Sequence, residues 1–173
     1  MADQYPQIAA GDELTAELLM SMLPRIVNKP SSTTRTSTIT TTLDPDLQME
    51  LEANATYFVE FYIHYAALAA EGFKTDWTVP TGTTGNKCVI GMASTASDAD
   101  ADESLGRFGV HNFSTDIRYG TRDHVGNQAF AYETATVVTS ASGVLGLNWT
   151  QTVAGTSGTT VFNTSLMRVT RLA

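Results

Sequence analysis

The residues most able to do chemistry gather in one acidic run, SDADADESLGRFG, at residues 97–109. Asp98, Asp100 and Asp102 alternate as the first three ligands of an EF-hand calcium loop do. The run lacks the glycine that such a loop needs at its sixth position and the glutamate that it needs at its twelfth. We therefore interpret it as a solvated acidic loop between strands, with a Ca²⁺ site as the alternative, and we predict no metal dependence.

Three histidines and one cysteine are the other candidates for chemistry. His64, His111 and His124 are widely spaced and form no HxH or HxxxH pair, so they do not predict a metal site. Cys88 lies in the apolar segment KCVIGM, and we interpret it as a small buried hydrophobe because no neighbouring base is available to activate it. We expect no catalytic residue, no cofactor and no enzymatic activity.

Two tryptophans could stack on sugars. Trp77 and Trp149 both lie inside strand-like segments, where aromatic side chains more often belong to a core or an interface. The glycine-rich segments do not match a phosphate-binding loop followed by a helix. The sequence therefore predicts no small-molecule site of a known type.

Composition and charge exclude further classes of function. The 173-residue chain carries a formal net charge of −8, which opposes binding to nucleic acid. No apolar run approaches the roughly 20 residues that span a bilayer, and the N-terminus lacks the basic start of a secretory signal. We expect a soluble protein that is made in a cytoplasm, and we interpret its four N-x-[ST] sequons as chance matches.

A period of two residues dominates the chain after residue 30. The hydroxyl-rich stretch SSTTRTSTITTTL is predicted to contain the first strand, Thr33–Leu43, because threonine favours pleated structure and Ile39 and Leu43 keep one register. Turn signals separate the later strand candidates, and a bend is expected near residues 163–165. Those candidates are residues 47–52, 54–68, 73–79, 87–92, 107–118, 129–140, 144–153 and 160–172.

The longest candidate strand, NATYFVEFYIHYAAL at residues 54–68, has two different faces. Tyr57, Val59, Phe61, Ile63 and Tyr65 form a fully apolar row, which predicts a central strand of a sheet. The opposite row mixes aromatic residues with a glutamate and a histidine, which indicates partial cover, such as that given by another subunit. Short strands at intervals of about ten residues predict an all-β fold, an antiparallel jelly-roll or β-sandwich.

The segment before this β-domain reads as a helix. In GDELTAELLMSMLP the apolar residues Leu14, Leu18, Leu19 and Met22 fall on one stripe, and Asp12 or Thr15 can cap the N-terminus. A helix of about ten residues is unstable alone in water, so it must dock on its own domain or on a partner. We divide the chain into an N-terminal arm at residues 1–30 and a β-domain at residues 31–173.

The order of several motifs resembles that of small virion structural proteins of tailed bacteriophages, particularly those that infect actinobacteria. The similar segments are AGDELTAELL, the threonine-rich strand, LEANATY entering the long strand, TVPTGTTGN, and the C-terminal LNWTQTVAGTSGTTVFNTSLMRVTRL. The resemblance extends from Ala10 to Leu172 and is weakest over residues 93–128. Each motif encodes only strands and turns, so their shared order carries the resemblance.

This resemblance implies a protein on the surface of the virion that has no catalytic residues. Related proteins are capsid decoration (minor capsid) proteins or minor tail proteins, and they resemble trimeric knobs of the tumour-necrosis-factor type. A homotrimer would give Phe58, Tyr62 and His64 a subunit interface. Leu14, Leu18, Leu19 and Met22 would anchor the knob to the major capsid protein.

The alternative is a tail protein at the tail tip or fibre that binds the host surface through the loops at residues 81–86, 93–106 or 118–128. No nucleic acid and no membrane is expected as a partner in either case. A depolymerase or an esterase is a third possibility, for which the sequence offers no catalytic pair.

Overall fold

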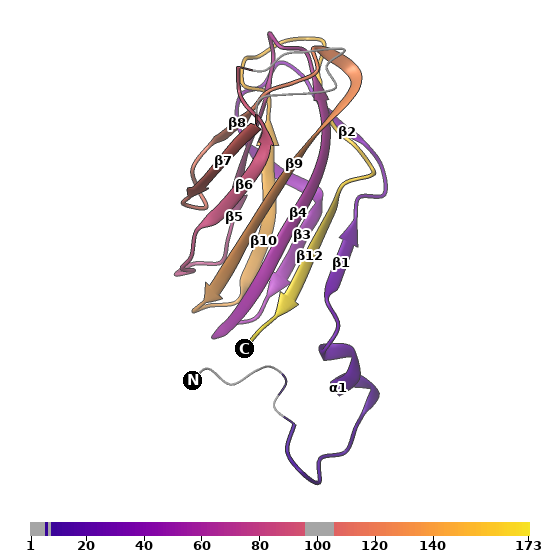
Figure 1. Ribbon diagram of the computed structural model, residues 1–173, viewed down its shortest axis with the longest axis vertical. Coiled ribbons are helices and arrows are strands. Elements are labelled where there is room, and N and C mark those ends of the chain that lie inside the picture. The colour runs from indigo at the N-terminus through magenta and orange to yellow at the C-terminus, as the bar shows by residue number, and fades with distance from the viewer. Residues whose placement is uncertain (1–5, 7, 96–105) are drawn as a thin grey trace.

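The computed structural model describes residues 6, 8–95 and 106–173. In this part of the chain, two antiparallel sheets pack face to face as a jelly-roll-like β-sandwich (Figure 1). A short helix, α1 (Ala16–Ser21), lies outside the sandwich at the end where the C-terminus is found. The predicted all-β class with a helix-containing N-terminal segment is therefore confirmed.

The larger sheet contains eight of the described strands, in the order β1-β12-β4-β9-β6-β7, with β11 paired to the end of β4 and β2 paired to β11. The long strand β4 lies between β12 and β9, as its fully apolar row predicted. The strands are β1 (Arg25–Asn28), β2 (Thr33–Arg35), β4 (Ala55–Ala67), β6 (Lys87–Met92), β7 (Gly106–His111), β9 (His124–Thr139), β11 (Thr159–Val161) and β12 (Leu166–Arg171).

The smaller sheet contains four of the described strands in the order β3-β10-β5-β8. They are β3 (Thr42–Leu51), β5 (Phe73–Thr78), β8 (Ile117–Tyr119) and β10 (Gly143–Thr150). The segment 107–118, predicted as one strand, is divided between the two sheets: β7 lies in the large sheet and β8 in the small one. The chain crosses between the sheets in the loop that contains Phe113, whose carbonyl accepts a hydrogen bond from Trp77 N at 3.0 Å.

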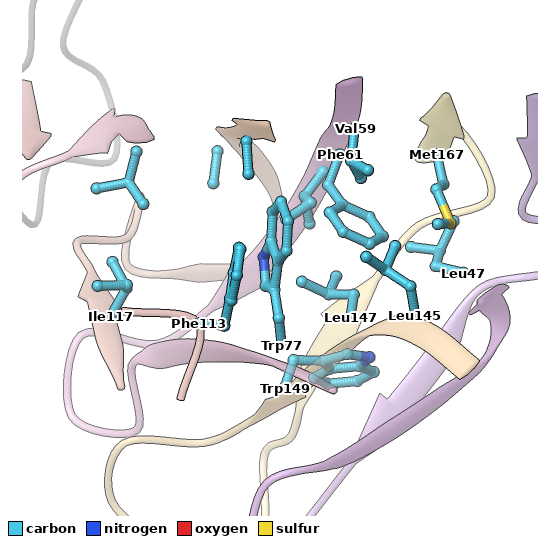
Figure 2. Packing of buried hydrophobic residues seen from close by; sticks show 14 of the residues in the cluster. Leu47, Val59, Phe61, Trp77, Phe113, Ile117, Leu145, Leu147, Trp149 and Met167 are labelled. Atoms are coloured by element: carbon cyan, nitrogen blue, oxygen red, sulfur yellow. The ribbon is translucent and has the colours of Figure 1, made fainter. Parts of the chain in front are cut away.

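The core lies between the two sheets (Figure 2). Phe61 of β4 packs edge-on against Trp77 of β5 at 4.8 Å between ring centroids, and Trp77 stacks on Phe113 at 5.5 Å. Trp149 is fully buried, and its indole Nε1 donates to Asp44 Oδ2 at 2.7 Å. Both tryptophans therefore belong to the core and are not available for stacking on a sugar.

The prediction of one continuous strand over Thr33–Leu43 is wrong. The strand stops at Arg35, turns through Ser37 at a φ of +54°, and resumes at Thr42. Arg35 causes the break, because its guanidinium lies over the Trp149 ring at 4.0 Å and donates to the carbonyls of Thr42, Leu43 and Trp149. Residues 36–41 must turn back for the carbonyls of Thr42 and Leu43 to reach the Arg35 guanidinium, so this segment is not extended.

The last residues of the predicted arm form a strand that the sequence did not indicate. β1 pairs with β12 at the edge of the large sheet, and Lys29, just after it, is fully buried. Its Nζ donates to Asp44 at 2.9 Å and to Asp46 at 2.8 Å, which ties the segment to β3. The bend expected near residues 163–165 is present, since the chain leaves the sheet between β11 and β12.

Candidate functional site

One face of the large sheet points away from the sandwich and carries large apolar side chains. We call this surface the outer apolar face. Phe108 and Val110 on β7 are 75% and 65% exposed, values that are unusual for strand residues of this size. The face consists of Tyr62 and His64 on β4, Phe130 and Tyr132 on β9, Cys88 and Ile90 on β6, and Phe108 and Val110 on β7.

The register of the strands brings these residues together. Tyr62 lies opposite Tyr132, Tyr132 lies opposite Ile90, and Ile90 lies opposite Phe108, so one row crosses four strands. A second row places Cys88 beside Val110. Because successive side chains in a strand point to opposite faces, the residues between them point into the core. The surface is therefore a continuous apolar array and not a set of scattered side chains.

The aromatic rings on this face contact one another. The Tyr62 ring lies 4.8 Å from the His64 ring and 6.0 Å from the Phe130 ring, measured between centroids. His64 Nδ1 is also 2.7 Å from the Thr164 hydroxyl. Partial burial among these groups lowers the pKa of His64 below its ordinary value of 6.5. The imidazole is therefore neutral at pH 7, in keeping with its apolar surroundings.

The face carries one carboxylate among the residues described there, and it is already paired. Glu60 accepts hydrogen bonds from Arg168 Nε on β12 and from the Tyr132 hydroxyl on β9. The bond from Arg168 outweighs the effect of burial and lowers the pKa of Glu60. Burial and the bond to Glu60 raise the pKa of Tyr132 to about 12. The network leaves the centre of the face without an unpaired negative charge.

The structure places the sequence-predicted interface residues unequally. Tyr62 is exposed, and His64 is half-buried beside it, so both belong to the outer apolar face. Phe58 is half-buried on the same side of the sheet but lies between Thr136 and Thr170, away from the other aromatic residues. The sequence reasoning missed the contributions of β9, β6 and β7.

Cys88 corrects a specific prediction, because it is exposed and not buried. Its neighbour Lys87 takes the inner position and is fully buried, with Nζ 3.6 Å from Glu133 Oε2. The alternation of KCVIGM was visible in the sequence, but the apolar character of the segment suggested that Cys88 is buried. Glu133 on β9, within a segment already predicted as a strand, was the signal that could have indicated the buried lysine.

The buried charges near Lys87 form a hydrogen-bonded network between the two sheets. Glu133 accepts hydrogen bonds from Trp77 Nε1 at 2.6 Å, from the Tyr119 hydroxyl at 2.7 Å and from the Thr75 hydroxyl. Burial lowers the pKa of Lys87, although Glu133 and nearby carboxylates oppose this effect. Both charged side chains are fully enclosed between the sheets, so this network is structural.

The N-terminal helix exposes most of its apolar stripe. The helix is only six residues long and is capped by Thr15, whose hydroxyl accepts from Leu18 N at 3.1 Å. Leu14, Leu19 and Met22 are at least half exposed, and Leu18 is half-buried. The end of the arm touches the sandwich around a cavity of about 200 Å³, whose lining includes Met20, Leu23, Tyr57 and Val169.

The remaining candidate ligands do not gather into a metal site in the part of the chain that the structure describes. Within residues 8–95 and 106–173, no group of three or more His, Cys, Asp or Glu side chains could hold a metal ion. The aspartates Asp98, Asp100 and Asp102 lie outside the described residues. No described helix is long and apolar enough to cross a membrane.

Comparisons with known proteins give only distant structural similarity. No protein family and no curated protein matches the chain. The solved structures found include infectious bursal disease virus of the Gx strain, at 8% identity and a TM-score of 0.21, and the VP2 subviral particle of the same virus, at 10% and 0.20. The alignments cover 99% of this chain but 42% and 46% of those chains, so it spans less than half their length. A likeness at these TM-scores carries no conclusion about function.

Proposed function

We propose that this protein is a non-enzymatic structural component of a bacteriophage virion, a homotrimeric knob that decorates and stabilises the capsid surface. The observation that supports it most is the outer apolar face. Exposed apolar patches of this extent on soluble proteins are usually sites of association, because covering them removes apolar surface from water. The motif order supports the assignment to a virion, and the trimer comes from the same resemblance.

A second copy of the chain is the partner that best fits this face. Each copy carries a net charge of −8, so two copies repel each other over most of their surface. On the outer apolar face the carboxylate of Glu60 is neutralised by Arg168, and the remaining residues are uncharged at pH 7. Two copies can therefore meet there with little electrostatic cost and bury aromatic side chains, which dominate the energetics of interfaces.

The N-terminal arm would provide attachment to the particle. A six-residue helix gains its stability from packing and not from its own hydrogen bonds. Its exposed Leu14, Leu19 and Met22 would be covered by the major capsid protein, and Leu18 would complete the apolar stripe. The arm and the outer apolar face would then serve different contacts, one to the particle and one between copies.

Attachment can be tested on purified particles of the phage that encodes this chain. We expect the double variant Leu18→Asp and Met22→Asp to fold and to associate as the wild type does but to be lost from particles, because two charges now lie on the apolar stripe. Ile39→Asp, which changes an exposed apolar residue away from the arm, is the matched control and should be retained. Recovery of the double variant at the wild-type copy number would contradict the proposed anchor.

A tail location is the second candidate, and one feature favours it. Residues from the predicted binding loops at 93–106 and 118–128 come together around a cavity at the end of the sandwich away from the arm. Immunogold labelling of intact particles separates the two locations. Gold over the head supports a decoration protein, whereas gold at the tail tip supports a protein that binds the host surface.

A further inference from the structure

A cavity of about 310 Å³ lies between loops of the sandwich that are far apart in the sequence. These loops follow β4, β6 and β10 and connect β8 to β9. Its volume lies at the lower end of the range for small-molecule sites and suits one sugar ring better than an extended chain. The polar residues that line it are Glu71, Ser94, Thr95, Arg118, Thr121 and Thr152.

The cavity and the arm lie at opposite ends of the same strand. The arm touches the sandwich near Tyr57, at the start of β4, whereas the cavity lies beyond Ala67, at its end. Thirteen strand residues separate them, which corresponds to about 40 Å. If the arm attaches to the particle, as the proposed function requires, the cavity faces away from it.

Arg118 is the cationic residue in the lining of this cavity. Among the residues that the structure describes, its guanidinium has no hydrogen-bond or ion-pair partner. Lys74, opposite Arg118 on β5, is paired with Asp116 at 2.8 Å and does not compete for an anion. Glu71 in the same lining forms no ion pair with Arg118; its carboxylate accepts from Gln151 Nε2 at 2.7 Å and from two backbone amides of residues 157–158.

The walls of the cavity are held in place by contacts within the fold. Gly72 adopts a φ of +65°, and a Cβ there would lie 2.9 Å from the Thr152 hydroxyl, so only glycine allows these two walls to meet. Thr152 N donates to the Glu71 carbonyl at 2.8 Å. Tyr119, which lines the base, is fixed by its bond to Glu133 and by packing against Phe73. The cavity is therefore formed before any ligand arrives.

We propose that this cavity binds an acidic sugar, a ring that carries hydroxyl groups and one carboxylate or phosphate. The anionic group pairs with Arg118, whose planar guanidinium suits both oxyanions. The ring hydroxyls bond to the side chains of Ser94, Thr95 and Thr152. An acidic sugar at the outward end of the knob is the kind of ligand that a bacterial surface presents to a phage.

The test uses three probes with the same ring, glucose, glucuronic acid and glucose 6-phosphate, measured by saturation-transfer NMR and calorimetric titration on the full chain. We expect saturable binding of one or both acidic probes and at least about tenfold weaker binding of glucose. The two acidic probes separate a carboxylate ligand from a phosphate ligand. Equal affinity for all three probes, or no binding at millimolar concentration, would overturn the proposal.

Two variants and one control variant locate the binding site. Arg118→Gln should reduce the affinity for the acidic probe by at least about tenfold. Arg25→Gln removes the same charge at the arm end and should leave affinity unchanged. Ala70→Trp, which fills the cavity from an exposed position without changing charge, should abolish binding. Binding that survives both Arg118→Gln and Ala70→Trp would place the site elsewhere. The measurement needs no particle, so its failure would leave the proposed anchor and self-association untouched.

Discussion

The two faces of β4 differ in what covers them, although both are rich in aromatic residues. Phe61 points inward and is fully buried against Trp77 of the opposite sheet. Tyr62, the next residue, points outward, and among the described residues its ring contacts the rings of His64, Phe130 and Tyr132, all in its own sheet. The inner face is covered by β3, β10, β5 and β8, whereas none of the described strands covers the outer one.

This difference indicates that packing within the single chain covers the inner face of β4, whereas covering the outer face requires another molecule. The inner face meets a complementary sheet, so its packing determines the stability of the single chain. The outer apolar face has the composition of an interface core, and none of the described strands forms a layer opposite it. We infer that the single chain is an incomplete unit and that association completes it.

The largest expected effect separates the two faces by stability. Phe61→Ala should lower the free energy of unfolding by about 3–5 kcal/mol, because it leaves a cavity in the core. Tyr62→Ala should lower that of the isolated monomer by less than about 1 kcal/mol, because an exposed side chain loses little on truncation. Chemical denaturation at concentrations where the protein is monomeric measures both, and equal losses would contradict the comparison.

Tyr62, whose truncation should have the smaller effect on unfolding, should have the larger effect on self-association. Tyr62→Ala is expected to weaken self-association by about 2 kcal/mol, or roughly 30-fold, if Tyr62 is a central contact. Ile39→Ala truncates an exposed apolar residue outside the outer apolar face and should change nothing. Sedimentation velocity over a concentration series gives both dissociation constants. A tyrosine variant that associates like the wild type would remove Tyr62 from the interface.

Cys88 offers a probe of the same surface that requires no engineering. The thiol is exposed in the single chain and lies on the row that includes Val110. We expect its reaction with a maleimide to be about tenfold slower in the assembled wild type than in a monomeric variant, because the interface excludes the reagent. Equal rates in the two proteins would show that the contact does not extend to β6.

The smallest expected effect is a dependence on pH through His64. Burial lowers the pKa of His64 from 6.5, and a covering subunit would bury it further. The histidine therefore favours the associated state fully above the pKa that it has in the monomer, which already lies below 6.5, and this contribution is lost as the pH falls through that pKa towards the still lower pKa of the associated state. The facing groups are Tyr62, Phe130 and Thr164, with the Glu60–Arg168 pair two residues along the strand.

The dissociation constant should rise a few-fold between pH 7.5 and 5.5 in the wild type, and His64→Gln should remove this change. His124→Gln, at the exposed start of β9, is the control and should keep it. An identical pH response in the His64 variant would assign the effect to another group.

The sequence was informative wherever one side chain type dominated a face. The alternation in β4 predicted its central place, and the sequence offered Asp12 or Thr15 as the cap of the helix, of which Thr15 is the one observed. The sequence-based predictions failed where one charged side chain made contacts within the fold that its usual preference for solvent would not suggest. Lys87 is buried by its pairing with Glu133, which moved Cys88 outward, and Arg35 broke a strand by binding three carbonyls.

The outer apolar face could be predicted only in part for a related reason. Tyr62 and His64 stand on one strand and share a readable pattern. Phe108 and Ile90 join them through pairings between β4, β9, β6 and β7, which depend on the topology and not on local periodicity. The cavity beside Arg118 depends likewise on loops brought together by the fold.

The central claim is that this protein assembles through the outer apolar face. Native mass spectrometry of the full chain at micromolar concentration tests it most directly, with Tyr62→Asp as the comparison and circular dichroism as the check that this variant folds. We predict a wild type at three times the chain mass and a folded Tyr62→Asp monomer. A monomeric wild type, or a Tyr62→Asp variant that still forms the wild-type oligomer, would contradict the claim.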